Sequence, residues 1–139
     1  MDHYSFPEKG IPEAYGPYSH AVVAGDYVFL SGQSGRDAQT GRVIDGDVKA
    51  QMRRSLEIVS DILAQLGLSL ADVVRTTVYL DALNDFAAMN DVFSSTFQPP
   101  YPARSTVQVQ LPHGARVAVE ATAYRPRVDD TSSTSSRNK

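Results

Sequence analysis

Two neighbouring segments near the C-terminal end alternate in polarity with a period of two. They span residues 102–111 and 116–124, and a Pro-His-Gly-Ala sequence at 112–115 separates them. A period of two is the pattern of a strand with one buried face, and proline and glycine are typical turn residues. The two segments are therefore predicted to pair as an antiparallel hairpin.

The two faces of this predicted hairpin differ in chemistry. One face holds small and apolar side chains, among them Val107 and Val119, and is expected to be buried. On the other face, counting back from the turn places Thr106 opposite Glu120, with Arg104 within reach. A solvent-exposed ion pair across two strands is the simplest interpretation of that pattern. The alternative is a functional site in which a guanidinium and a carboxylate lie side by side.

Length, charge and cysteine content exclude several classes of protein. The chain has 139 residues, which predicts one domain, and a formal net charge of −3 without a basic run, which argues against nucleic-acid binding. It has no cysteine, so disulfides, thiolate nucleophiles and cysteine-ligated zinc are excluded. The N-terminus lacks the apolar region of a signal peptide, and no stretch approaches 18 consecutive apolar residues. A cytoplasmic protein without a membrane segment is expected.

The remaining elements follow from hydrophobic periodicity and from turn residues. Asp45 or Asp47 can cap the first helix, Gly67 is suited to its C-terminal end, and Asp81 can cap the second helix. Glycines in the loop at 32–41 have neither the spacing nor the lysine of a phosphate-binding loop. The predicted elements are strands at 18–24, 27–31 and 72–80 and helices at about 47–66 and 83–97.

The order strand, strand, helix, strand, helix, strand, strand predicts an α+β fold. Both helices can cover one face of a single mixed sheet, which gives two layers. Residues 1–16 are expected to form an extended arm, 17–126 the domain, and the serine-rich end at 127–139 a disordered polar tail. The second sheet face is predicted to meet water or another subunit, since it receives exposed aromatic side chains: Tyr27, Phe29, Tyr79 and Tyr124.

One polar residue interrupts the apolar stripe of the second helix. Asn90 falls among the apolar positions of that stripe: Leu83, Phe86, Phe93 and Phe97. An asparagine buried without partners costs about 1–3 kcal/mol, so this one should be hydrogen-bonded within the structure or lie at a site. The sequence pattern leaves both interpretations open.

Six short motifs follow one another along the chain: Gly16-Pro17-Tyr18-Ser19, Ser31-Gly32-Gln33, Thr76-Thr77-Val78-Tyr79-Leu80, Leu83-Asn84-Asp85-Phe86 with Asn90, Pro102-Ala103-Arg104-Ser105 and Val119-Glu120-Ala121-Thr122-Ala123. Together they resemble the Rid family, the reactive intermediate deaminases that are also called YjgF-like or endoribonuclease L-PSP proteins. The resemblance covers residues 16–125 and rests on the motifs together, because no single one is specific.

The resemblance implies a chorismate-mutase-like fold assembled as a homotrimer. In that family the sheets line a central barrel, and three sites lie in clefts between subunits. The implied reaction is hydrolysis of reactive 2-enamino or 2-imino acids, such as 2-aminoacrylate, to 2-keto acids and ammonia. No metal and no organic cofactor is implied, and the three histidines lack ligand spacing: His3, His20 and His113.

The resemblance also assigns roles to residues of this chain. Arg104 matches the arginine that holds the substrate carboxylate, for which its planar fork is suited. Glu120 matches the carboxylate that positions and deprotonates the attacking water. The other matching positions are expected to bind substrate: Tyr18, which closes over it, Ser31 and Gly32, which line the pocket floor, Asn90 and Thr106.

Two departures from the family pattern bear on activity and on substrate range, respectively. Many deaminase members carry cysteine where this chain has Thr106, and an apolar residue with proline where it has Ser34-Gly35. The alternatives to a general imine deaminase are a specialised catabolic deaminase with an aminomuconate-like substrate and a non-catalytic trimeric sensor of small keto acids. Ribonuclease activity is not favoured, because neither charge nor motif predicts RNA binding.

Overall fold

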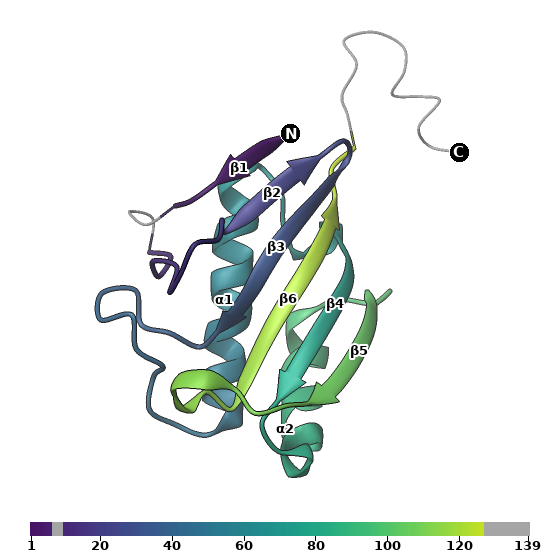
Figure 1. Ribbon diagram of the computed structural model, residues 1–139. Coiled ribbons are helices and arrows are strands. Elements are labelled where there is room, and N and C mark those ends of the chain that lie inside the picture. Colours follow the sequence, from purple (N-terminus) through teal and green to yellow (C-terminus); the bar gives the residue numbers. More distant parts are fainter. Residues whose placement is uncertain (7–9, 127–139) are drawn as a thin grey trace, which may run out of the picture.

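The computed structural model describes residues 1–6 and 10–126, and the predicted tail at 127–139 lies outside them. A six-stranded sheet carries two helices on one face (Figure 1). Three 3-10 turns lie at Leu70–Asp72, Leu83–Asp85 and Pro112–Gly114. The strands are β1 (Asp2–Tyr4), β2 (Ala21–Ala24), β3 (Tyr27–Ser34), β4 (Val73–Leu80), β5 (Ala103–Gln108) and β6 (Val117–Tyr124), and the helices are α1 (Val48–Gln65) and α2 (Phe86–Thr96).

The strand order in the sheet is β1-β2-β3-β6-β4-β5. All neighbouring strands pair antiparallel except β4 and β5, which pair parallel. The two-layer α+β fold predicted from the sequence is therefore confirmed. The N-terminal arm adds β1, which pairs with β2 and was not predicted. His20 holds this arm, because its Nδ1 accepts a hydrogen bond from the Phe6 N–H and its Nε2 donates one to the Pro12 carbonyl.

The predicted hairpin between the last two strands is wrong. β4 lies between β5 and β6, so Thr106 does not lie opposite Glu120. The reason is the strand–helix–strand order β4-α2-β5, which returns β5 parallel to β4 on its free edge. The chain between β5 and β6 crosses the end of β4 instead of turning tightly, and the Val109 N–H donates to the Leu80 carbonyl over 2.9 Å.

This pairing also reverses the faces that were predicted for β5. In the register of β4 with its two neighbours, Thr77 aligns with Glu120 and with Ser105. Arg104 aligns with Thr76, whose side chain is buried on the helix-covered face. Since paired residues in a sheet share a face, Glu120 lies on the open face and Arg104 on the helix-covered face.

α1 forms as its sequence predicts. Asp47 caps its start by accepting a hydrogen bond from the Ala50 N–H over 3.0 Å. Gly67 follows its C-terminal end with a φ of 74°, a conformation that glycine adopts without strain. The side chains of α1 that meet the sheet form the centre of the core: Met52, Leu56, Val59, Ile62 and Leu63.

The start of α2 differs from the prediction. No side chain caps it or the preceding 3-10 turn, and Asp81 instead accepts a hydrogen bond from the Leu111 N–H over 3.3 Å. Asp81 therefore holds the β5–β6 connection against the end of β4. Neither α1 nor α2 is long and apolar enough to cross a membrane, which holds for every helix in the described part of the chain.

The open face of the sheet carries aromatic side chains. Tyr27, Phe29 and Tyr124 are 46%, 48% and 37% exposed in the single chain. Tyr27 and Tyr124 lie in cross-strand register, with ring centroids 5.6 Å apart. This is the face on which aromatic side chains were predicted, and contiguous aromatic area among polar groups is typical of a protein interface.

Candidate functional site

Arg104 lies half-buried between β5 and α2. Its guanidinium carbon is 4.7 Å from the ring centroid of Phe93 and 5.7 Å from that of Phe86. One terminal nitrogen lies 3.8 Å from the sulfur of Met89. Burial lowers the pKa of Arg104, but an arginine remains charged at neutral pH.

No acidic side chain in the described part of the chain pairs with this guanidinium. The two ion pairs within residues 1–6 and 10–126 join Lys49 to Asp91 and Arg54 to Glu57. A partly desolvated cation without an anion gains more from binding one than an exposed cation does, because water competes less for it. The surroundings of Arg104 therefore suit a small carboxylate.

Asn90 lies beside Arg104 on the wall of the same cavity. The cavity has a volume of about 550 Å³, and Tyr101 and Ser94 also line it. The apolar stripe predicted around Asn90 is wrong in part, because the buried positions of α2 are Met89, Val92 and Phe93, and Asn90 is half-buried. Leu83 and Phe86, which were assigned to that stripe, are 53% and 39% exposed. A polar residue is accommodated here because it faces an open cavity.

Glu120 lies on the other face of the sheet. Its carboxylate accepts a hydrogen bond from the hydroxyl of Tyr79 on β4. This hydrogen bond raises the pKa of Tyr79, with smaller contributions from burial and from the charge of Glu120. Tyr79 was expected to contribute only aromatic area, because the sequence did not show that β4 neighbours β6.

Tyr18 and Gly32 line a second cavity, which has a volume of about 320 Å³ and also includes Tyr15 and His113. The hydroxyl of Tyr18 accepts a hydrogen bond from the Tyr15 N–H over 3.1 Å. Ser31 does not line this cavity, and its hydroxyl donates to the Ser19 carbonyl over 2.6 Å. Ser31 therefore holds the backbone of Ser19, the residue next to Tyr18.

The predicted site residues thus fall into two groups within one chain. Arg104 and Asn90 form the first, and Thr106 is half-buried on the same strand face as Arg104. The second consists of the cavity of Tyr18 and Gly32 together with Glu120, which follows the lining residue Ala118 by two positions on the open face of β6. Within the described residues, no group of three or more His, Asp or Glu side chains is arranged to hold a metal ion.

Comparison with known proteins shows the family of this chain. The family model described as Endoribonuclease L-PSP matches residues 9–125, nearly the whole length of the domain. The chain belongs to this family. The resemblance to Rid proteins noted in the motifs is thereby confirmed.

Relatives within the Endoribonuclease L-PSP family have different names. A RutC family protein of Pyrococcus abyssi is 46% identical over 121 residues, covering 86% of this chain and 94% of the relative. A 2-iminobutanoate/2-iminopropanoate deaminase of Capra hircus is 42% identical, covering 82% and 84%. The structure of Escherichia coli TdcF with bound serine has a TM-score of 0.83 and 41% identity, covering 91% of this chain and all of that one.

Proposed function

We propose that this protein hydrolyses 2-imino acids and their 2-enamino tautomers to 2-keto acids and ammonia. The observation that carries the proposal is the half-buried guanidinium of Arg104, which lines a cavity beside Asn90 and has no acidic partner among residues 1–6 and 10–126. Relatives named 2-iminobutanoate/2-iminopropanoate deaminase support it, and TdcF crystallised with an amino acid that carries a carboxylate like the proposed substrates.

In the proposed reaction Arg104 binds the substrate carboxylate through two parallel hydrogen bonds. Glu120 accepts a proton from a water molecule, whose oxygen attacks the imine carbon while the imine nitrogen takes up a proton. The resulting carbinolamine loses ammonia as its hydroxyl proton is removed and the carbonyl forms. One water is consumed, and one keto acid and one ammonia are released, so no oxidant or reductant is needed.

Such a site requires residues from two copies of the chain. Arg104 pairs with Thr76 and Glu120 pairs with the next residue, Thr77. Because successive residues of a strand point to opposite faces, Arg104 and Glu120 lie on opposite faces of one sheet. We propose a homotrimer in which Arg104, Asn90 and Thr106 of one subunit meet the Tyr18–Gly32 cavity and Glu120 of its neighbour. The exposed aromatic side chains of the open face supply area for that contact.

A coupled assay tests the proposed reaction. An amino-acid oxidase generates imines from several amino acids, semicarbazide traps the imine that persists, and added protein should lower the trapped fraction. Arg104→Ala is expected to lose this effect. Arg53→Ala is the matched control, because Arg53 is an exposed arginine of α1 that lines neither the Arg104 cavity nor the Tyr18 cavity. Unchanged trapping with every imine and intact wild-type protein would refute the proposal.

The second candidate is a sensor that binds a keto acid without turnover. The hydrogen bond from Tyr79 to Glu120 favours this trimeric sensor, because it gives the carboxylate a structural partner on the open face of the sheet. Glu120→Gln separates the two functions. A sensor keeps its affinity for keto acids, measured by calorimetry, whereas the deaminase loses turnover while still binding the product.

A further inference from the structure

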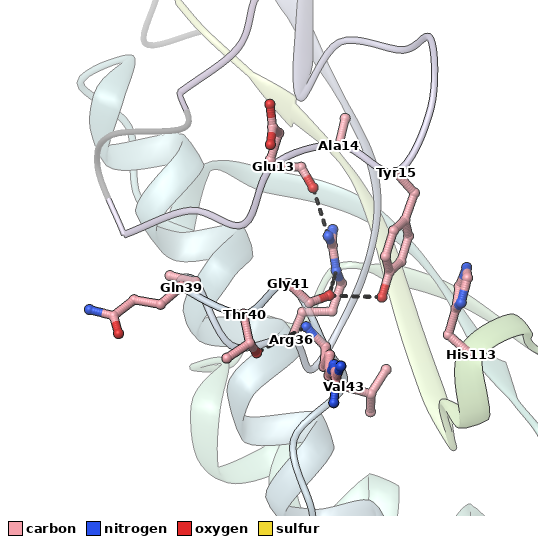
Figure 2. A pocket seen from close by; sticks show the side chains of 11 residues that line it. Glu13, Ala14, Tyr15, Arg36, Gln39, Thr40, Gly41, Val43 and His113 are labelled. Atoms are coloured by element: carbon pink, nitrogen blue, oxygen red, sulfur yellow. Dashed lines mark hydrogen bonds between the residues drawn. The ribbon is translucent and has the colours of Figure 1, made fainter.

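Arg36 is a buried arginine that neither the fold core nor the proposed reaction accounts for. It lies just after β3 and is only 5% exposed. Its Nε donates to the Gly41 carbonyl over 2.8 Å, and a terminal nitrogen donates to the Glu13 carbonyl over 2.7 Å. Its guanidinium carbon lies 3.5 Å from the ring centroid of Tyr15, so the cation stacks on that ring (Figure 2).

Tyr15 is held from three directions. Arg36 covers one side of its ring, and the imidazole of His113 stacks at a centroid distance of 4.3 Å. Its hydroxyl donates to the Gly41 carbonyl over 3.0 Å, the same carbonyl that Arg36 binds (Figure 2). The ring therefore joins three segments of the chain: the N-terminal arm, the loop after β3 and the turn before β6.

The Tyr15 backbone in turn fixes Tyr18. The Tyr15 N–H donates to the Tyr18 hydroxyl oxygen, and the rings of both tyrosines line the 320 Å³ cavity. Because this bond uses a lone pair of the phenol oxygen, the hydroxyl proton of Tyr18 is left to donate elsewhere. No hydrogen bond within residues 1–6 and 10–126 uses that proton.

The cavity of about 660 Å³ beside Arg36 is less suited to be a ligand site. Arg36 lines it together with exposed residues such as Gln39 and Thr40 (Figure 2), and the exposed Arg42 lines it as well. The guanidinium there is already bound to two carbonyls and one ring, so it offers little to an anion. The guanidinium of Arg36 instead contacts Tyr15, which lines the neighbouring cavity of about 320 Å³.

We propose that Arg36, acting through Tyr15, is a positioning residue. It fixes the position of the Tyr18 hydroxyl and leaves the proton of that hydroxyl free to donate a hydrogen bond. The inference rests on the proposed deaminase function, in which Tyr18 closes over the substrate. Residues at a site need support from neighbours that lock their conformation, and a stacked, doubly hydrogen-bonded guanidinium is a rigid support. The substrate contact of Tyr18 thereby depends on a residue that never touches substrate.

A double-mutant cycle between Arg36 and Tyr18 tests this inference. Arg36→Met and Tyr18→Phe are each expected to lower kcat/KM by roughly 2- to 13-fold, the range of one neutral hydrogen bond. The double variant should be no slower than the slower single variant, because both changes remove the same contact. Arg36→Lys should behave like Arg36→Met, since an ammonium cannot stack flat. Arg42→Met is the matched control and should keep wild-type values.

If the double variant lowers kcat/KM by the product of the two single effects, the inference is overturned. That result would mean that the two changes act independently, as a general loss of structure in Arg36→Met would. Wild-type protein that turns over no imine would instead refute the proposed function. In that case a measurement without substrate decides on positioning: ¹⁹F NMR of protein labelled with 3-fluorotyrosine, with the Tyr18 resonance assigned by its loss in Tyr18→Phe. Arg36→Met should shift or broaden this resonance and Arg42→Met should not. An unmoved resonance in folded Arg36→Met overturns the inference.

Discussion

Replacing Arg104 with methionine is expected to remove carboxylate binding while changing the free energy of unfolding little. The guanidinium gains from its two aromatic neighbours, and such contacts contribute roughly 0.5–1 kcal/mol each at partly exposed sites. Against this stands the cost of desolvating a charge that has no anion, which is why burial lowers its pKa. Methionine keeps the packing against Phe93 and Met89, so the free energy of unfolding should change by less than about 1 kcal/mol.

The effect on binding should be much larger. A hydrogen bond between charged groups contributes about 1.5–3 kcal/mol, which corresponds to a roughly 13- to 160-fold weaker binding of a 2-keto acid. Urea unfolding at a fixed protein concentration measures the first quantity, and calorimetry with a keto acid measures the second. Arg53→Met is the control for loss of a positive charge.

Two results would refute this reasoning about Arg104. A loss of more than about 2 kcal/mol of unfolding free energy in Arg104→Met would mean that the guanidinium is a structural group, since such losses come from broken buried networks or cavities. Unchanged affinity for the keto acid in a well-folded variant would mean that the anion binds elsewhere.

Three further predictions follow from individual contacts. Gly35→Ala should lower the free energy of unfolding by about 1–3 kcal/mol in urea titrations, because a Cβ there would lie 2.6 Å from the backbone oxygen of Gln51 in α1. Tyr79 has a raised pKa in the folded protein, so the unfolding free energy should fall as pH rises above the ordinary value of 10.0, and Tyr79→Phe should lose this dependence. Oligomers co-assembled from Arg104→Ala and Glu120→Gln subunits, each inactive alone, should regain activity in about one quarter of their sites.

Each of these has a control and a contradicting outcome. Gly32→Ala is the control for Gly35, because a Cβ at Gly32 meets nothing within 4 Å, and equal losses in both variants would contradict the close approach to α1. For Tyr79, an unfolding free energy with the same alkaline dependence in Tyr79→Phe would assign that dependence to another group. Mixed oligomers that stay inactive would contradict a site that is shared between two subunits.

Hydrophobic periodicity predicted the elements of this fold well and their neighbours poorly. The stripe of α1, the cap at Asp47 and the glycine after the helix are local properties, and each formed as predicted. The pairing of β5 is not local. The alternating pattern of β5 shows that its two faces differ, but the neighbouring strand decides which face is buried. That neighbour is β4, which lies between β5 and β6. The strand–helix–strand order around α2 was the signal for parallel pairing.

The same non-local step explains what could be predicted of the candidate site. The motifs identified Arg104, Asn90 and Glu120 as candidate site residues. The structure brings Arg104 and Asn90 to one cavity. The hydrogen bond between Tyr79 and Glu120 depends on β4 neighbouring β6, which no spacing in the sequence shows. Arg36 could not be found from periodicity at all, because it lies in a loop and its partners come from the distant N-terminal arm.

The division of the candidate site between the two sheet faces gives assembly a chemical role. Side-chain rotation cannot bring Arg104 and Glu120 together through a sheet whose helix-covered side is filled by the core. Arg104 can still reach a neighbouring molecule, because β5 is the edge strand of the sheet and Arg104 lines a cavity between this strand and α2. If the carboxylate anchor and the water-activating group come from different subunits, dissociation separates them without unfolding either. Activity should then fall on dilution while the helix content of the protein stays constant.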